Sequence, residues 1–184
     1  MRMIQIDKEN MSSDLILLYN SKFVEKIQKT LLQKYIKNHL NHIEEPIISN
    51  LDNQKENLII IVDFEKEVQL DSEFIQLKYF RDILENLDKN TNYKNIVTII
   101  SEIGVLGDEI HYFRALQYAA VINIAQAYAL RLGSLKIRLN NICVPENFEL
   151  LEKSTLISLV KFLLSQESMN ITGQTLSLSR ELLR

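Results

Sequence analysis

Short apolar runs alternate along this chain with longer segments in which apolar residues recur every three or four positions. The short runs predict buried strands, and we expect them at residues 14–19, 46–48, 58–62, 95–100, 136–143 and 174–178. The three- and four-residue spacing predicts helices with one buried face, at residues 22–40, 72–87, 111–132 and 154–165. Strands that alternate with helices predict an α/β fold, in which a mostly parallel sheet is flanked by helices.

Two of these segments carry the clearest patterns. Residues 58–62 are all aliphatic and almost all β-branched, which is typical of a central parallel strand that is covered on both faces. Residues 111–132 form the longest of the expected helices and are rich in alanine, and Gly133 follows as a stop signal. No internal repeat divides the chain, so we expect a single domain over residues 1–184.

Composition and charge narrow the function classes. The chain has 184 residues and a mass of 21.5 kDa, which suits one domain with a sizeable core. The net charge is -3 and the pI is about 5.7, so the chain has no basic excess with which to neutralise a phosphate backbone. We therefore expect no nucleic-acid partner.

Signals for export and for membrane insertion are equally weak. The longest purely aliphatic run, residues 58–62, is far shorter than the roughly 20 residues that span a bilayer. Residues 1–13 contain no apolar signal core and include acidic residues. Cys143 is the only cysteine and cannot form an intramolecular disulfide. We expect a cytoplasmic protein without a membrane partner.

Glycine is scarce. The chain has four glycines, and the first of them is Gly104. Phosphate-binding loops depend on glycine because its missing side chain lets the backbone approach a pyrophosphate closely. A glycine-rich nucleotide-binding loop is therefore not expected in the first half of the chain.

Two groups of side chains could bind a metal ion, but each has a simpler interpretation. One lies at the end of the helix expected at 22–40 and the other follows the strand at 58–62: His39, His42, Glu44 and Glu45, and Asp63, Glu65 and Glu67. The first group lacks a convincing further ligand shell, and a solvated helix end explains it. The second group could bind Mg²⁺, yet a strand end in solvent explains it as well. We predict no metal site.

Four segments between residues 94 and 178 resemble the C-terminal half of the short-chain dehydrogenase/reductase family, which includes the ketoacyl-carrier-protein reductases. They are IVTIISEIGVLG at 96–107, AAVINIAQAYALRLG at 119–133, IRLNNIC at 137–143 and NITGQTL at 170–176. All four glycines of the chain fall at glycine positions of the family pattern. The resemblance implies a Rossmann-like fold, reduced relative to a full member of the family.

The resemblance also implies where catalytic residues would stand. The family places a serine after the strand, a tyrosine thirteen residues later and a lysine four residues after that. Those positions hold Ser101, Arg114 and Tyr118 here. Arginine has no proton to give near neutral pH, and Tyr118 cannot supply the charge of the missing lysine. Tyr112 is two residues from the required position, which turns it roughly 200° around a helix.

Other functional segments of the family also differ in this chain. The glycine-rich turn expected after the first strand is replaced by the glycine-free segment 19–23, and acidic Asp63 stands in the loop after the next matching strand. The Pro-Gly expected after Cys143 is replaced by Val144 and Pro145, so we expect the substrate lid to be absent. We therefore expect NAD(P) binding to be lost and no intact catalytic set.

Each of two further residues has both a catalytic and a structural interpretation. Ser101 could be a surviving catalytic group, although a strand-end hydroxyl that satisfies local backbone groups explains it better. Cys143 could be a nucleophile, although no activating base is evident and a packing role fits an apolar strand.

These expectations give three hypotheses of function. The first is a catalytically inactive short-chain dehydrogenase-like protein, a pseudoenzyme that acts as a structural or regulatory subunit. It would pair through the helix at 111–132 with itself or with an active ketoreductase homologue. The second is a small-ligand or acyl-carrier binding module, and the third is an NAD(P)H-dependent ketoacyl reductase with an altered site.

Overall fold

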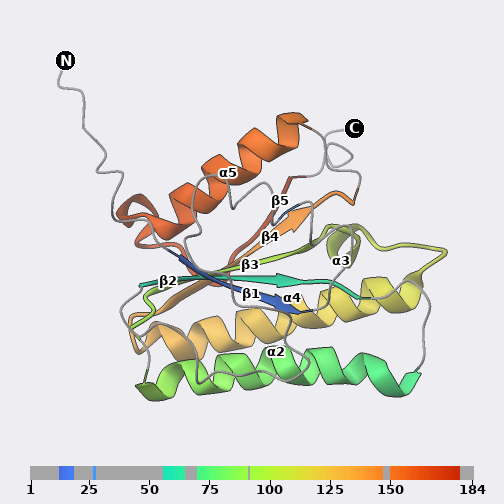
Figure 1. Ribbon diagram of the computed structural model, residues 1–184, viewed down its shortest axis with the longest axis horizontal. Coiled ribbons are helices and arrows are strands. Elements are labelled where there is room, and N and C mark those ends of the chain that lie inside the picture. Colours follow the sequence, from blue (N-terminus) through green and yellow to red (C-terminus); the bar gives the residue numbers. More distant parts are fainter. Residues whose placement is uncertain are drawn as a thin grey trace.

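The computed structural model describes residues 13–18, 27, 56–64, 70–90, 92–146 and 150–178, which form a three-layer α/β domain (Figure 1). The elements are β1 (Ser13–Leu18), β2 (Asn57–Val62), α2 (Leu70–Asn90), β3 (Asn95–Ser101), α3 (Ile103–Leu106), α4 (Tyr112–Gly133), β4 (Arg138–Val144), α5 (Leu150–Leu164), the 3₁₀ helix η2 (Gln166–Ser168) and β5 (Thr175–Ser177).

The five strands form one sheet in the order β1-β2-β3-β4-β5, and every neighbouring pair is parallel. All residues of β2 and β3 are buried, as their apolar, β-branched sequences require of strands with a helix layer on each side. Because the strands are parallel, their carboxyl ends meet at one edge of the sheet, which we call the carboxyl edge.

Two apolar cores lie on opposite faces of the sheet. On one face α2 and α4 pack against the strands through Phe80, Leu84, Val121 and Ala125 among others. On the other face α5 packs through Leu156, Val160 and Leu163, and buried Ile27 joins this core. Figure 1 shows the same layers, with α5 above the sheet and α2 and α4 below it.

The order of the strands has a topological consequence. Each connection steps to the next strand in the same direction across the sheet, yet α5 lies on the opposite face from α2 and α4. The connection from β4 through α5 to β5 therefore has the opposite hand to those through α2 and α4. It brings a helix onto the face of β2, β3 and β4 that α2 and α4 leave open.

The fold class expected from the sequence is confirmed, since the structure is a Rossmann-like α/β domain with a parallel sheet flanked by helices. Five of the expected strands are present, and so are the helices expected at 72–87, 111–132 and 154–165. The strand expected at 46–48 lies outside the described residues, as does all of the helix expected at 22–40 except Ile27, which is helical.

Several element boundaries differ from the expectation. The helix expected from 154 begins at Leu150, and α2 extends beyond 72–87 at both ends. The strand expected from Lys136 begins at Arg138, because Lys136 has a positive φ of 61° and turns the chain out of α4. The short helix α3 was not expected, because four residues are too few to show a helical period.

No helix within the described part of the chain has the length and apolar character needed to cross a membrane.

Gly104 sets how closely α3 approaches α4. A Cβ atom built at Gly104 would lie 2.6 Å from the Cβ of Tyr118 and 2.9 Å from its carbonyl carbon. These atoms belong to the helix at the position where Tyr118 enters the core, so they cannot move aside independently. The glycine therefore permits the contact that holds this part of α4 in place.

We predict that Gly104→Ala lowers the free energy of unfolding by about 1–3 kcal/mol, because the added methyl forces α3 and α4 apart. Gly133→Ala is the matched control, since a Cβ at Gly133 meets nothing within 4 Å. The control should be neutral or stabilising by up to about 1 kcal/mol. Urea unfolding of the two variants measures the difference, and equal stabilities would contradict the prediction.

Candidate functional site

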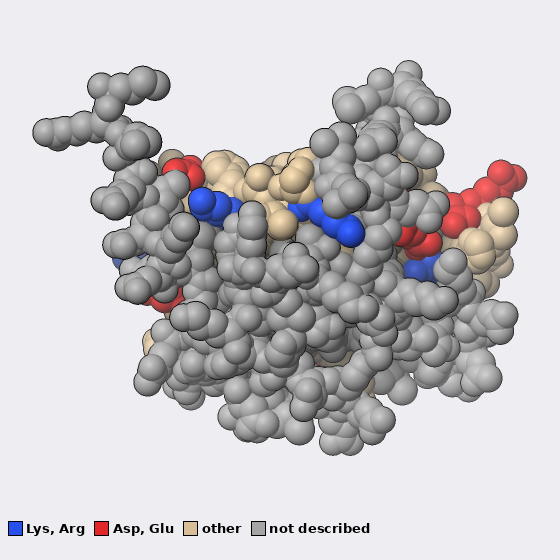
Figure 2. Space-filling model, turned by 45° about the horizontal axis from the view of Figure 1, so that its top comes forward, with Lys and Arg blue, Asp and Glu red and all other residues tan. Residues whose placement is uncertain are grey.

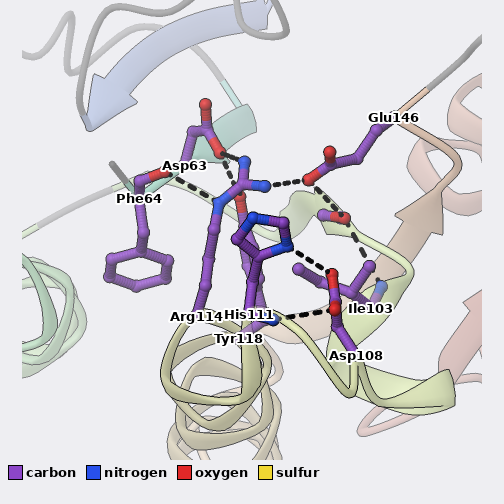
Figure 3. Close-up of polar contacts among 9 residues, drawn as sticks. Asp63, Phe64, Ile103, Asp108, His111, Arg114, Tyr118 and Glu146 are labelled. Atoms are coloured by element: carbon purple, nitrogen blue, oxygen red, sulfur yellow. Dashed lines mark hydrogen bonds and ion pairs between the residues drawn. The ribbon is translucent and has the colours of Figure 1, made fainter. Parts of the chain in front are cut away.

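Charged side chains from three elements meet at the carboxyl edge of the sheet. Asp63 follows β2, Glu146 lies shortly after β4, and Arg114 reaches them from α4 (Figure 3). Tyr118 lies one helical turn after Arg114, so both side chains are on the same face of α4. We call these four residues the edge cluster.

The guanidinium of Arg114 is the centre of the edge cluster. Its Nη2 donates to Asp63 Oδ1 at 2.9 Å, and its Nε donates to the carbonyl oxygen of Phe64 at 2.9 Å. Its Nη1 donates to Glu146 Oε1. The side chain of Arg114 is only 5% exposed, so the ionic pairs lie largely out of water. Every nitrogen of the guanidinium therefore has an acceptor inside the protein.

Tyr118, Asp63 and Arg114 Nη2 form the inner half of the edge cluster, and Glu146 and Arg114 Nη1 form its outer half. The Tyr118 side chain is fully buried, and its hydroxyl donates to Asp63 Oδ1 and accepts from Arg114 Nη2 at 3.2 Å. The ring of Phe64 meets the ring of Tyr118 edge-on, with centroids 4.9 Å apart. Burial first, and then the charge of Asp63, raise the pKa of Tyr118 well above its usual value. The phenol is therefore neutral over the physiological pH range.

The charges in the cluster depend on one another. Burial opposes the charge of Arg114, but Tyr118, Asp63 and Glu146 outweigh it and raise the pKa of the guanidinium. Two carboxylates thus share one cation that stays protonated. An arginine in this state does not act as a general acid, whereas it binds oxyanions through several directed N–H groups.

Ser101, at the end of β3, is fully buried next to this cluster. Its Oγ lies 3.5 Å from Glu146 Oε1 and accepts a hydrogen bond from the backbone N–H of Ile103 at 3.4 Å. The hydroxyl therefore links the start of α3 to the segment after β4, as expected of a strand-end serine that satisfies local groups.

A second polar pair lies at the start of α4. Asp108 Oδ1 accepts from the backbone N–H groups of Ile110 at 2.9 Å and His111 at 2.8 Å, and Asp108 Oδ2 lies 3.1 Å from His111 Nδ1. The backbone N–H of His111 is the main cause that lowers the pKa of Asp108. His111 is the N-cap residue of α4, three residues before Arg114, so the pair of Asp108 and His111 flanks the edge cluster on its outer side (Figure 3).

The structure brings together all three residues that the family resemblance placed at catalytic positions, since Ser101 meets Arg114 through Glu146, and Arg114 contacts Tyr118. Sequence reasoning missed Glu146, which links Ser101 to Arg114, and it missed the pair of Asp108 and His111. Asp108 lies four residues before the first residue of α4 and accepts from the backbone N–H groups two and three residues later, and an aspartate just before a helix is a recognisable signal for such a turn. No local pattern points to Glu146, because its partners are 32 and 45 residues away.

The expectation that Asp63 lies at a strand end in solvent is wrong. The Asp63 side chain is 1% exposed, because Arg114 and Tyr118 cover it and supply its hydrogen bonds. The other proposed metal ligands, His39, His42, Glu44, Glu45, Glu65 and Glu67, lie outside the described residues. Within the described ranges, no three His, Cys, Asp or Glu side chains are grouped so that they could hold a metal ion.

Cys143 is fully buried in the core between the sheet and α4. Burial, with a smaller effect from the charge of Glu102, raises the pKa of its thiol to about 12. A thiol in this state is almost wholly protonated near neutral pH, which favours the packing role over a nucleophilic one.

We predict that Arg114→Met lowers the free energy of unfolding by about 3–5 kcal/mol, because it leaves the Asp63 carboxylate buried without a cation. Asp63→Asn in the same chain should restore part of this loss, so the double variant is more stable than the sum of the single changes implies. Urea unfolding of the wild type, both single variants and the double variant gives the coupling. Additive losses would contradict the buried ion pair.

No protein-family model matches the chain, and no curated protein matches its sequence. Similar solved structures include a 4-hydroxyisoleucine dehydrogenase complexed with NADH, with a TM-score of 0.61 at 15% identity over 90% of this chain and 96% of that chain. A 4-hydroxyisoleucine dehydrogenase complexed with NADH and succinate gives a TM-score of 0.61 at 17% identity, over the same shares of both chains.

The enoyl-acyl carrier protein reductase of Bacillus cereus, with NADP⁺ and an indole naphthyridinone, is also similar. Its TM-score is 0.59 at 12% identity, over 95% of this chain and 97% of the reductase. At these identities the likeness concerns the fold alone. The chain therefore has the Rossmann-like fold that NAD(P)-dependent dehydrogenases and reductases also have.

Proposed function

We propose that this protein is a catalytically inactive relative of the short-chain dehydrogenases/reductases that acts by association. It would work as a structural or regulatory subunit, either as a homodimer or together with an active ketoreductase homologue. The observation that carries the proposal is the state of the family's tyrosine and lysine positions. Arg114 and Tyr118 stand there, and both are held in a buried ionic cluster.

The edge cluster supports the loss of catalysis in chemical terms. The general acid of such a reductase must release a proton to substrate, but the guanidinium at this position stays protonated. The phenol of Tyr118 is fully buried and already donates to Asp63. These features favour a protein without NAD(P)-dependent turnover.

The solvent-facing side of α4 supports association. Leu116 and Leu130 are 64% and 84% exposed and lie fourteen residues apart, which places them on the same side of the helix. Exposed Asn123 and Ala127 lie between them, so a second helix could approach closely. Further apolar side chains are exposed near the start of α4, namely Val105, Ile110, Tyr112 and Phe113. Apolar exposure of this extent is typical of interaction surfaces.

The charge distribution does not favour a nucleic-acid partner. The chain has a net charge of -3, and among the described side chains on the face drawn in Figure 2 basic and acidic groups are interspersed. Binding of a phosphate backbone depends on a continuous basic surface. A protein partner that meets the apolar side of α4 is therefore the better proposal.

We predict that Leu116→Glu together with Leu130→Glu dissociates the assembly, because two charges would be buried at its centre. Native mass spectrometry of the tagged protein from its own host should give a dimer or a stoichiometric complex with a reductase-sized subunit, and a monomer for the double variant. Leu135→Glu is the control, since Leu135 is 48% exposed but lies beyond the end of α4. A monomeric wild type, or a double variant that stays assembled, would contradict the proposal.

We also predict that Arg114→Tyr with Tyr118→Lys does not restore reductase activity. The new lysine would face Asp63 in the core, and the substitutions supply no phosphate-binding loop. Oxidation of NADH and NADPH is followed by absorbance with a panel of ketones, for the wild type and the double variant. Turnover by the unmodified protein would favour the alternative, a reductase with an altered site.

A further inference from the structure

The outer half of the edge cluster has the chemistry of a carboxylate-binding site that the chain fills with its own side chain. Arg114 Nη1 donates to Glu146 Oε1, and Ser101 Oγ lies 3.5 Å from the same oxygen. Donors from α4 and from the end of β3 thus converge on one oxygen position (Figure 3). A guanidinium N–H and a hydroxyl are a common donor set for an oxyanion.

The two carboxylates of the cluster differ in how firmly they are enclosed. The Asp63 side chain is 1% exposed and takes hydrogen bonds from both Arg114 and Tyr118. The Glu146 side chain is 29% exposed, and among the described residues its hydrogen bonds are to Arg114 Nη1 and Ser101 Oγ. The inner half would therefore remain intact if Glu146 moved away, while Nη1 and the serine hydroxyl would lose their acceptor.

The surroundings define the anion that fits. Asp63 already shares the guanidinium, so a dianion such as phosphate would be repelled more strongly than a single negative charge. His111, whose side chain is 40% exposed and whose Nδ1 lies 3.1 Å from Asp108 Oδ2, flanks the cluster on its outer side. A small monocarboxylate has the charge and the oxygen geometry that Glu146 itself presents.

We propose that Glu146 is a tethered ligand, whose carboxylate occupies a site at Arg114 and Ser101 that binds a small free monocarboxylate when Glu146 is removed. The inner half of the edge cluster holds Arg114 in place, so its Nη1 stays in position when Glu146 is absent. This inference concerns the edge cluster alone, so it does not depend on the proposed association or on the loss of catalysis.

The test is thermal unfolding of Glu146→Ala in sodium acetate and in sodium chloride at equal ionic strength. Acetate should raise the unfolding temperature in a saturable way, by about 3 °C at a concentration roughly ten times the dissociation constant. Glu146→Gln is the matched control, because its amide oxygen still fills the site and accepts from Arg114. Glu167→Ala, an exposed glutamate on η2, controls for general effects of acetate.

A folded Glu146→Ala protein with equal unfolding temperatures in the two salts would overturn the inference, and so would an equal response in Glu167→Ala. If Glu146→Ala folds only in acetate and not in chloride, the inference is supported. Glu146→Asp retains the charge but is one methylene shorter, and it provides a second variant. It should respond to acetate less than Glu146→Ala, and a response of Glu146→Asp that is larger than that of Glu146→Ala would also overturn the inference.

Discussion

The ion pair that Arg114 makes with Asp63 and Glu146 is the interaction on which this domain's carboxyl edge depends. A guanidinium that is 5% exposed has lost nearly all of its hydration, so it is stable only with charged acceptors in place. The acceptors come from the segments after β2 and β4, and the cation comes from α4. The pair therefore determines how the helix sits over the ends of two strands.

The rest of the architecture brings these groups together. A parallel sheet ends all its strands at one edge, and in open α/β sheets that edge is where ligands bind. Here side chains of the protein itself meet at that edge, with Asp63 and Tyr118 inside and Glu146 outside. Gly104 lets α3 lie against the backbone of α4 at Tyr118, so the helix can present its polar face toward the strands. Packing and electrostatics thus support the same arrangement.

The elements of this fold could be predicted from the sequence because their patterns are local. The aliphatic run 58–62 within β2 and the helical spacing of α4 can each be recognised within one segment. The resemblance to a known family also placed Ser101, Arg114 and Tyr118 near one another. The boundary of an element was less predictable where the backbone conformation of one residue decides it. Lys136 is an example, because its positive φ delays the start of β4 to Arg138.

The pairing within the site could not be predicted in the same way. Asp63 has the sequence context of a solvated strand end, and only the position of Arg114, fifty-one residues later, makes it a buried ion-pair partner. Glu146 lies in a segment with no periodic pattern, and its contacts follow from where β4 ends relative to α4. Such pairs depend on the packing of elements distant in sequence, and local propensity carries no information about them.

We propose that Arg114 and Tyr118 stand in place of the catalytic groups of a reductase at this edge and that the edge holds no working NAD(P) site. The most direct measurement is an equilibrium titration of the purified wild-type protein with NADH and with NADPH by isothermal calorimetry. The account predicts no saturable binding of either dinucleotide. Binding of either one with a micromolar dissociation constant would contradict it, because the edge would then hold a working cofactor site.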